Sequence, residues 1–331
     1  AASIAALQEA GAGAGASPLI SGHMAPHAAL EAEIAGWLGC EAALVFGSGY
    51  HANIGVLAAL LRAGDEVLSD ELNHASLIDG CRLSRATVRI FRHRDVDDLA
   101  RRLEQPHARR RLIVSDSVFS MDGDLAPVVE MARLAERHDA WLMLDEAHAM
   151  GVLGEDGAGL AARLGAGARV TVRMGTLGKA LGGYGAFVAG SRALIELLVN
   201  RARAYVYSTA LPPAVVGAAR AAVAIARREP ERREALWRNA RRLHARLAAA
   251  GIAMQPLESP IIPLLVGEAN AALRVAERAC ELGVLAPAIR PPTVPPGTAR
   301  LRLTPIATHT EEQIDRAADV LVRAFEESRI R

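Results

Sequence analysis

The chain has 331 residues, of which 51% are hydrophobic and 23% charged, and its formal net charge is +1. This composition is that of a globular protein with enough apolar material for one large core and a smaller second one. The near-neutral charge gives no electrostatic reason to expect nucleic acid or a membrane surface as a partner, and no stretch reaches the roughly 20 apolar residues of a membrane span.

Three cysteines, Cys40, Cys81 and Cys280, are widely spaced and form no CxxC pair. We expect them to be buried thiols in a reducing compartment, because paired cysteines are typical of secreted domains. The first residues lack both a methionine and a signal-peptide pattern. These features predict a cytoplasmic protein and are consistent with removal of an N-terminal segment.

The first two thirds of the chain alternate between predicted strands and predicted helices. Helical periodicity indicates helices at 26–38, 53–62, 76–85, 96–103, 127–137 and 192–200. Short apolar runs indicate buried strands at 43–46, 66–68, 112–115, 141–144, 170–174 and 186–189. This alternation predicts an α/β fold with a mostly parallel central sheet and helices on both faces.

After Pro212 and Pro213 the pattern changes to a long Ala/Arg-rich helical region that reaches about residue 250, with a break near Pro230. Strand patterns follow at 261–266 and 301–304, and helical patterns at 270–282 and from 311 onward. We therefore predict a large domain over residues 1–215, and a connecting helix with a small C-terminal α+β domain over residues 216–331.

One lysine stands alone among the cations, because the 38 Lys and Arg residues include a single lysine, Lys179. It follows a predicted strand in a glycine-rich turn, residues 175–183, among small apolar residues. Partial desolvation there lowers the pKa of an amine and favours the neutral nucleophile, which arginine cannot supply. Ala180 stands where a P-loop needs Ser or Thr, so that motif is excluded. The alternative is a surface lysine at a helix start.

A carboxylate and a histidine follow another predicted strand, at Asp145 and His148. The carboxyl end of such a strand is where open α/β sheets bind ligands. A carboxylate that pairs with the pyridinium nitrogen and a lysine that forms a Schiff base are what a pyridoxal-phosphate enzyme needs. We therefore predict this cofactor, although an Asp-Glu pair after a strand is also a common helix N-cap.

Other candidate residues are weak signals when each is taken alone. Gly49 and Tyr50 belong to a Gly-rich turn that opens a helix, where backbone N–H groups suit a phosphate. The remaining candidates are His74, whose ring could stack on a planar group, the hydroxyls of Thr176, Ser208 and Thr209, and the guanidinium groups of Arg290 and Arg302, which suit a carboxylate.

Taken in order, these segments resemble the α-oxoamine synthases among the fold-type I (aspartate-aminotransferase-like) pyridoxal-phosphate enzymes. The resemblance covers nearly the whole chain. The motifs that carry it are SGH at 21–23, PHAALE at 26–31, SGY at 48–50, NHASL at 73–77, VFSMDGD at 118–124, DEAH at 145–148, TLGK at 176–179, YST at 207–209 and RPPTVP at 290–295.

The resemblance implies roles for particular residues. Lys179 carries the cofactor, Asp145 pairs with its pyridine nitrogen, and His74 stacks on its ring and meets the substrate. His148 and Ser120 contact the ring oxygen, while Gly49, Tyr50 and Thr176 position the cofactor. Ser208 and Thr209 reach the phosphate of the neighbouring subunit's cofactor, which implies a homodimer with shared active sites. Thr293 contacts the substrate and Arg302 the amino-acid carboxylate, and no metal is implied.

The proline-rich segment at 290–295, with residues 297–304, favours the branch that condenses L-alanine with a pimeloyl thioester of coenzyme A or a carrier protein, in biotin biosynthesis. Two alternatives remain, a sister synthase that uses glycine, serine or another acyl thioester, and a catalytically silent dimeric scaffold. Members of the family carry a further N-terminal segment that helps to bind the acyl group, and Gly-Thr is more usual where Ala149 and Met150 stand here.

Overall fold

The structure is a computed structural model that describes residues 1–105 and 109–329. The chain divides into two compact units. Unit 1 comprises Ala1–Val118 and Ala126–Pro230, and unit 2 comprises Phe119–Leu125 and Glu231–Arg331. The domain boundary that we predicted after residue 215 falls two residues beyond the start of a helix at Pro213, whereas the two units change at Pro230.

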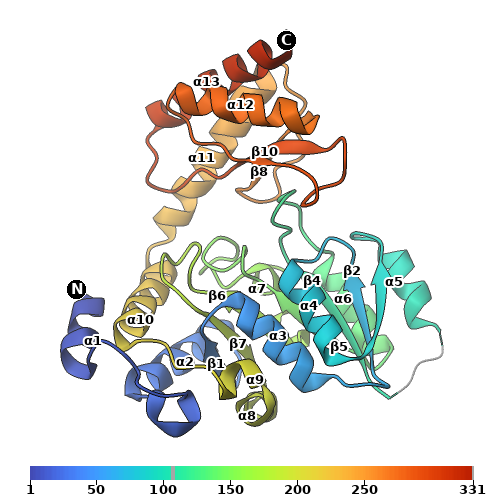
Figure 1. The fold of residues 1–331 in the computed structure, drawn as a ribbon, viewed down its shortest axis with the longest axis vertical. Helices are drawn as coiled ribbons and strands as arrows, with labels where there is room; N and C mark the ends of the chain where they lie inside the picture. Colours follow the sequence, from blue (N-terminus) through green and yellow to red (C-terminus); the bar gives the residue numbers. More distant parts are fainter. Residues whose placement is uncertain (106–108, 330–331) are drawn as a thin grey trace. The chain divides into compact units, whose positions relative to one another are not determined.

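In its described part, unit 1 contains a seven-stranded sheet with the order β1-β7-β6-β5-β4-β2-β3 (Figure 1). The strands are β1 Ala42–Phe46, β2 Glu66–Asp70, β3 Thr87–Phe91, β4 Arg111–Asp116, β5 Trp141–Asp145, β6 Val172–Thr176 and β7 Ala186–Gly190. Strand β7 is antiparallel to both β1 and β6, and the other neighbours are parallel. The prediction of a mostly parallel sheet is confirmed.

The helices of unit 1 connect these strands and cover the sheet. They are α1 Ala2–Ala10, α2 Ala25–Leu38, α3 Gly49–Leu60, α4 Ala75–Ser84, α5 Val96–Leu103, α6 Val128–Arg137, α7 Leu160–Arg163, α8 Arg192–Arg201, α9 Arg203–Val206 and α10 Pro213–Arg228. A π-helical turn at Pro18–Gly22 and a 3₁₀ turn at Gly167–Arg169 complete the set that the structure describes.

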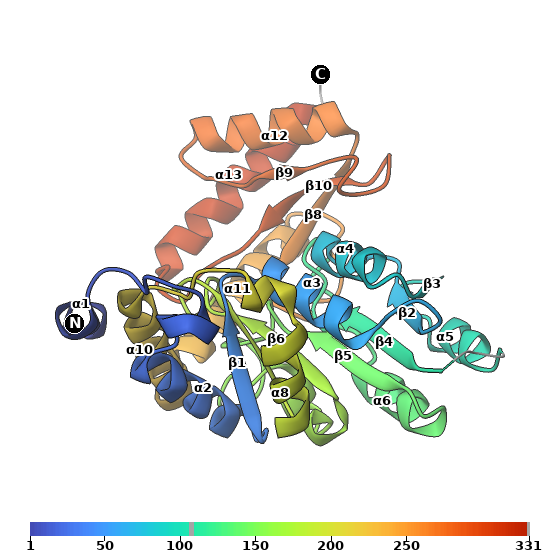
Figure 2. The ribbon, with the colours of Figure 1, turned by 60° about the horizontal axis from the view of Figure 1, so that its bottom comes forward.

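Alternate residues of the strands face two separate cores, which is why helices cover both faces (Figure 2). In β1, Leu44 and Phe46 pack with α3, α4 and α8, whereas Ala43 and Val45 pack with α2 and α10. Strands β2, β4 and β7 are buried along their whole length, as expected for a sheet that is covered on both faces. Helices therefore cover both faces of the sheet, and the carboxyl ends of the strands are the place where such folds bind ligands.

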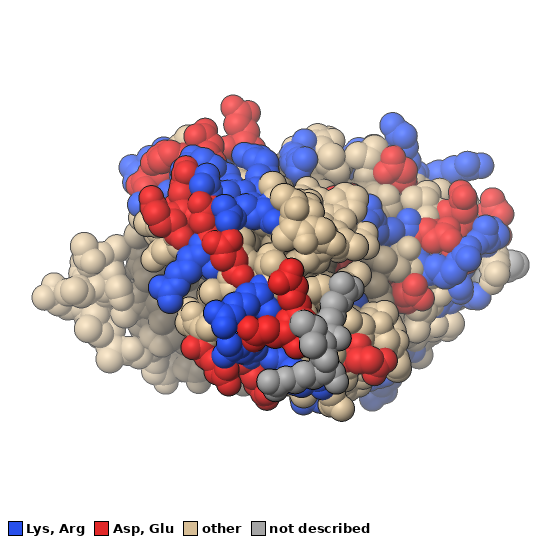
Figure 3. Space-filling model, turned by 90° about the horizontal axis from the view of Figure 1, so that it is seen from above, with Lys and Arg blue, Asp and Glu red and all other residues tan. Residues whose placement is uncertain are grey.

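Unit 2 has its own core, formed by a described three-stranded antiparallel sheet and three helices. The strands β8 Ile262–Gly267, β10 Ala299–Leu303 and β9 Ala288–Ile289 lie in that order, and the helices are α11 Pro230–Ala249, α12 Ala269–Glu281 and α13 Glu311–Arg329. Arg242 on α11 bonds Asp315 on α13 at 2.7 Å, and Arg246 is paired with Asp319. Figure 3 shows acidic and basic side chains interspersed on the face that it draws.

Two further expectations concern membranes and cysteines. Among the described helices, none combines the length and the apolar character that crossing a bilayer requires.

The three cysteines are free thiols, and Cys81 is buried on α4, where burial raises its pKa to about 12. Cys280 is exposed at the end of α12, so the expectation that all three are buried is wrong.

Candidate active site

The polar residues of unit 1 gather at the carboxyl ends of neighbouring parallel strands. Asp116 ends β4 and Asp145 ends β5, and the two residues are direct partners in the sheet register. Asp145 is also the register partner of Met174 on β6, which ends two residues later at Thr176. The turn after β6 then carries Lys179. Sheet pairing therefore brings together residues that lie far apart in the sequence.

Lys179 lies beside His148, with 3.0 Å between Nζ and Nε2. Gly178, Lys179 and Ala180 are exposed, because the glycine-rich turn after β6 lies on the surface of unit 1. We expected burial to desolvate the Lys179 amine, and burial within the chain does not do so. The imidazole supplies a neighbour that can accept a proton from the amine or donate one to it.

Asp145 is buried, with 4% of its surface exposed, and both of its carboxylate oxygens are held. The Asn53 side-chain amide donates to Oδ2 at 2.8 Å, and the Ala147 N–H donates to Oδ1 at 2.9 Å. Asn53 lies on α3, the helix that begins at the Gly49 turn, so the same helix that presents that turn also orients the carboxylate. The sequence did not single out Asn53.

A chain of hydrogen bonds continues from Asn53 to His74. The Asn53 amide also donates to Ser76 Oγ at 2.8 Å, and Ser76 Oγ lies 2.7 Å from His74 Nδ1. The Ser76 N–H donates to the same ring nitrogen at 3.2 Å. Because Nδ1 accepts these bonds, a neutral His74 carries its proton on Nε2. His74 also caps the start of α4, because its side chain accepts the bond from the Ser76 N–H.

Asp116 fixes the backbone of the same turn. The His74 N–H donates to Asp116 Oδ2 at 2.7 Å, while the Asp116 N–H donates to Asn73 Oδ1 at 2.8 Å. Burial, followed by repulsion from Asp145, holds the pKa of Asp116 well above its usual range.

The glycine-rich turn before α3 lies against the end of β6. A Cβ added to Gly49 would approach Thr176 Cγ2 to 2.9 Å, so the position requires glycine. Ser48 caps α3 by accepting a bond from the His51 N–H at 3.2 Å. The hydroxyl of the exposed Tyr50 donates to Asp79 Oδ2 at 2.8 Å, which raises the pKa of Tyr50.

Ser208 and Thr209 follow α9 and line a small cavity of unit 1 together with His23, His27 and Glu31. His23 Nε2 lies 2.8 Å from Glu31 Oε2, and this contact raises the pKa of His23. His27 lies 2.8 Å from the Leu211 carbonyl, and burial lowers its pKa. Ser208 and Thr209 therefore line the same cavity as these two histidines.

The remaining predicted site residues belong to unit 2. Ser120 and Arg302 are in contact, because the Arg302 guanidinium donates to the Ser120 carbonyl. Burial lowers the pKa of Arg302. Thr293 is exposed in the proline-rich turn, and its N–H donates to the Arg290 carbonyl at 3.0 Å. Arg302 on β10 therefore contacts the segment 119–125, and the bond that the structure gives for Thr293 is made by its backbone.

Glu146, the residue after Asp145, has a structural role that the sequence did not reveal. Its carboxylate bonds the Arg173 guanidinium at 2.7 Å, and both side chains are 1% exposed. The Ala161 N–H donates to the same carboxylate at 2.8 Å. Arg173 also donates to the carbonyl of Leu38 at 3.2 Å. This buried ion pair ties β6 to the segments on either side of it.

Ala149 and Met150, where the family more often has Gly-Thr, are both fully buried. Met150 belongs to the core that also contains Leu177 and Phe187. A Cβ on Gly175 would approach Met150 Cγ to 2.8 Å, so the glycine makes room for the longer side chain. The additional volume of Ala149 and Met150 relative to Gly-Thr is therefore accommodated in the core beneath the turn that carries Lys179.

Comparisons with known proteins show the family of the chain. The model of the family "Aminotransferase class I and II" matches residues 2–321. An 8-amino-7-oxononanoate synthase of Alkalilimnicola ehrlichii is 55% identical over 309 residues, which cover 93% of this chain and 79% of that protein. The structure of serine palmitoyltransferase from S. paucimobilis with bound PLP–myriocin aldimine has a TM-score of 0.96 at 32% identity, covering 100% of this chain and 84% of that one. An 8-amino-7-oxononanoate synthase of Francisella tularensis has a TM-score of 0.84 at 27% identity, covering 98% and 92%.

The chain therefore belongs to the class I and II aminotransferase family, in its 8-amino-7-oxononanoate synthase branch, and is a transferase whose cofactor is pyridoxal phosphate. The predicted fold type and cofactor are thereby confirmed. The residues of unit 1 fit that cofactor, because a lone amine beside an imidazole and a buried carboxylate occupy the carboxyl edge of one sheet. The roles of the individual residues stay proposals.

Proposed function

We propose that the protein catalyses the decarboxylative condensation of L-alanine with a pimeloyl thioester, a step of biotin biosynthesis. A carbon–carbon bond forms between Cα of alanine and the thioester carbonyl, coenzyme A or a carrier thiol leaves, and the alanine carboxylate departs as carbon dioxide. The observation that carries the proposal is the 55% identity to a synthase named for the product, 8-amino-7-oxononanoate.

Lys179 is the residue that would hold the cofactor covalently, as the only side-chain amine of the sequence. With substrate bound, this amine would take the proton from Cα of alanine. His148, 3.0 Å from Nζ, orients this amine and relays its proton. The bound cofactor supplies an electron sink for the negative charge that develops at Cα.

Asp145 would pair with the ring nitrogen, and its burial and its bond from Asn53 favour a fixed carboxylate there. His74, with its proton on Nε2, is suited to cover one face of a planar ring and to donate to the substrate. Gly49, Tyr50 and Thr176 are proposed to position the cofactor. The contact between Gly49 and Thr176 supports this proposal for two of them.

Arg302 is proposed to bind the alanine carboxylate, since its guanidinium is held in place by the Ser120 carbonyl. Ser120 and Thr293 are proposed to contact the ring oxygen and the substrate, respectively. Ser208 and Thr209 are proposed to reach the cofactor phosphate of a second subunit, which makes the active enzyme a homodimer.

The proposal is tested with the pyridoxal-phosphate-loaded protein, L-alanine and pimeloyl-CoA, by measuring release of carbon dioxide and the mass of the product. We expect turnover by the protein and none by Lys179→Ala. The matched variant Lys179→Arg keeps the positive charge but lacks a nucleophilic amine, so it should be equally inactive. Turnover by either variant, or a product mass other than that of 8-amino-7-oxononanoate, would contradict the proposal.

A second candidate function is a sister condensation that uses L-serine or glycine with another acyl thioester. It is favoured by the TM-score of 0.96 to a serine palmitoyltransferase, although that protein is 32% identical. The two candidate functions are distinguished by measuring kcat/KM for L-alanine, L-serine and glycine, each with pimeloyl-CoA and with palmitoyl-CoA. A kcat/KM that is highest for L-serine with palmitoyl-CoA would establish the second candidate in place of the first.

A further inference from the structure

The exposed side chain of His74 is held by side chains that are buried. His74 stands just before α4, and it is exposed, whereas its neighbours Ser76 and Asn53 are 1% and 0% exposed. Its backbone N–H is bonded to Asp116, which is buried as well. An exposed side chain ordinarily changes its rotamer within nanoseconds. The contacts on the buried side of the imidazole therefore decide which ring nitrogen is presented to a ligand.

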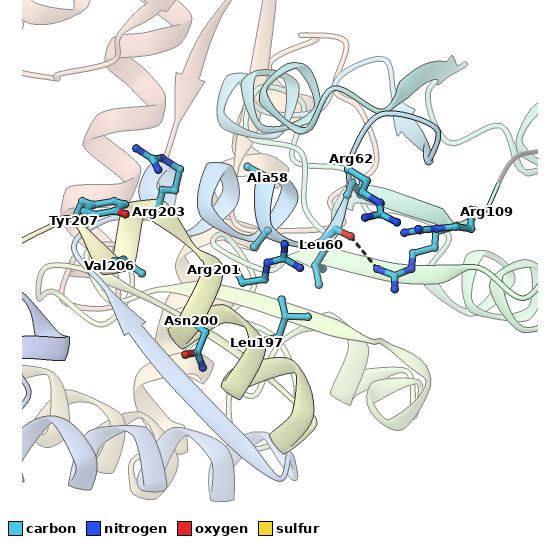
Figure 4. A pocket seen from close by; sticks show the side chains of 13 residues that line it. Ala58, Leu60, Arg62, Arg109, Leu197, Asn200, Arg201, Arg203, Val206 and Tyr207 are labelled. Carbon is cyan, nitrogen blue, oxygen red and sulfur yellow. Dashed lines mark hydrogen bonds between the residues drawn. The ribbon is translucent and has the colours of Figure 1, made fainter.

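Asn53 reaches the ends of the strands from the first half of α3. Its amide bonds Asp145 Oδ2 at 2.8 Å. Residues at the other end of the helix, Ala58 and Leu60 among them, line the arginine-rich pocket of Figure 4 instead. Asn53 therefore belongs to the part of α3 that faces the candidate active site.

The hydrogen atoms in this chain of bonds are arranged in one direction. The Asn53 amide nitrogen carries two hydrogen atoms and accepts none, so it donates one to Asp145 Oδ2 and the other to Ser76 Oγ, both at 2.8 Å. A flipped amide would place its oxygen against the carboxylate, which cannot donate. The hydroxyl hydrogen of Ser76 is then left for His74 Nδ1, which lies 2.7 Å from Oγ.

The Ser76 hydroxyl makes the shorter of two bonds to the imidazole. The Ser76 N–H donates to the same Nδ1 at 3.2 Å, and the hydroxyl oxygen lies at 2.7 Å. Both bonds need an Nδ1 that carries no proton. Serine is common in the first turn of a helix, but the bonds that the structure gives for Ser76 Oγ go to the side chains of Asn53 and His74. The start of α4 therefore does not account for this hydroxyl.

We propose that Ser76 is a positioning residue, whose hydroxyl keeps His74 as a hydrogen-bond donor through Nε2 and connects the orientation of that donor to Asp145 by way of Asn53. The inference rests on the proposed function, in which Asp145 and His74 contact the cofactor and the substrate. Ser76 acts only through these two residues. The carboxylate and the imidazole are thereby oriented as one unit before a ligand binds.

The test observes the imidazole of His74 directly, by ¹⁵N NMR of the pyridoxal-phosphate-loaded protein with labelled histidine. The spectra are recorded at pH 8.5, where an imidazole is ordinarily neutral. The sequence has 10 histidines, and the signals that disappear in His74→Gln are those of His74. A ring nitrogen that carries a proton resonates far from one that does not. We expect two widely separated signals in the parent protein, with the proton on Nε2.

In Ser76→Ala, the two His74 signals should move toward each other, because the tautomer with its proton on Nδ1 becomes populated. The matched control is Ser84→Ala, which removes the other buried serine hydroxyl of α4. The Ser84 hydroxyl donates to the Cys81 carbonyl at 2.6 Å, at the opposite end of the helix. The control should leave the His74 signals where they are in the parent protein.

Kinetics with L-alanine and pimeloyl-CoA provide a second measurement. Ser76→Ala should lower kcat/KM for L-alanine by roughly three- to tenfold, as expected for the loss of one hydrogen bond, and Ser84→Ala should leave it unchanged. If the parent protein shows no turnover, the proposed function fails, while the NMR comparison still decides the role of Ser76. Unchanged His74 signals in Ser76→Ala, an equal change in Ser84→Ala, or a kcat/KM of Ser76→Ala equal to that of an active parent would each overturn the inference.

Discussion

Asn53 bridges two parts of the candidate active site, because its amide bonds both Asp145 and Ser76 at 2.8 Å. The side chain is fully buried on α3, so Asn53→Ala leaves both partners without their donor. We expect a loss of about 1–3 kcal/mol in the free energy of unfolding, together with weaker cofactor binding. Urea denaturation of the cofactor-free protein and a pyridoxal-phosphate titration measure the two effects.

The matched control for this substitution is Asn200→Ala. The Asn200 amide donates to the Glu196 carbonyl within its own helix, at an exposed position. Asn200→Ala should measurably change neither the free energy of unfolding nor the affinity for pyridoxal phosphate. If Asn53→Ala also left cofactor binding unchanged, then Asn53 would have no part in orienting Asp145.

His23 gives the stability of unit 1 a pH dependence of predictable sign. Its contact with Glu31 raises its pKa above the unfolded value of 6.5. The contact therefore stabilises the folded state fully below that value, and its contribution is lost as the pH rises through the folded pKa. Because the imidazole is partly exposed, the contribution is at most about 1 kcal/mol.

The measurement compares the free energy of unfolding of the protein and of His23→Asn at pH 5.5 and pH 8.5. The difference between the two proteins should be larger at the lower pH. A difference that is the same at both values, or larger at the higher one, would mean that protonated His23 does not stabilise the fold.

At the scale of single residues, the sequence identified those whose chemistry is unusual for their surroundings. Lys179 is notable because it is the only lysine, and the structure does bring it beside His148. Asn53 gave no such signal, since an asparagine within a helical pattern has no fixed partner until the sheet register is known. Glu146 was weighed as part of an N-cap, and its partner Arg173 lies on another strand.

At the scale of elements, the buried pair of Glu146 and Arg173 connects β6 to its surroundings. Arg173→Met leaves the Glu146 carboxylate buried without its cation, which costs about 3–5 kcal/mol of folding free energy. The control is Arg169→Met, which breaks the exposed pair with Glu136 and should cost far less. Urea unfolding monitored by circular dichroism measures both, and similar losses in the two variants would contradict the argument.

Helices α3 and α4 pack closely at Gly80. A Cβ at this position would approach Leu57 Cδ1 to 2.6 Å and the Asn53 carbonyl to 3.1 Å. Gly80→Ala should therefore push α4 away from α3 and destabilise the fold by about 1–3 kcal/mol. Thermal unfolding together with the cofactor affinity detects both consequences, since α4 also carries Ser76.

Gly36 provides the opposite expectation within α2. A Cβ there meets nothing within 4 Å, so Gly36→Ala should stabilise the helix, by up to about 1 kcal/mol. A destabilised Gly36→Ala variant, or a Gly80→Ala variant as stable as the parent, would show that close packing is not what requires glycine at position 80.

The predicted elements were most accurate where burial is complete. The helical pattern at 96–103 coincides with α5, and the apolar runs at 112–115 and 186–189 lie within β4 and β7. Strand β3 was missed because it is an edge strand whose first four residues are exposed or partly so, and its sequence therefore lacks an apolar run. Short elements such as β9 and α7 give too few residues for any periodicity.

At the scale of the whole molecule, the proposed sharing of active sites between subunits has a direct test. A Lys179→Ala subunit lacks the amine, and a subunit with Ser208→Ala and Thr209→Ala lacks the hydroxyls proposed to cross the interface. If the sites are shared, a mixed dimer contains one site that has both sets of residues. Mixing the two inactive proteins after partial denaturation should therefore restore measurable turnover.

The control for this experiment mixes Lys179→Ala with Asp145→Ala, both of which damage residues of unit 1 that lie on the same strand edge. That mixture should remain inactive, since neither kind of site in the mixed dimer is complete. Turnover in the control, or none in the first mixture, would contradict the proposed arrangement. The oligomeric state follows from light scattering of the loaded protein.

Family and cofactor could be predicted from the sequence because the motifs that carry them are local, such as TLGK at 176–179. The contacts that orient those motifs could not, because Asn53 and Asp145 lie on different elements and are joined only by the fold. The cytoplasmic location and the assignment of substrates stay predictions.

Lys179, exposed in the turn after β6, is the single side-chain amine of the sequence that a reagent can modify. An acylating reagent therefore modifies one side chain, and a cofactor bound there blocks the reaction. Intact-mass spectra of the acylated protein would show loaded and empty subunits as two separate peaks. The fraction of working sites in a preparation can then be counted directly, without substrate and before any assay.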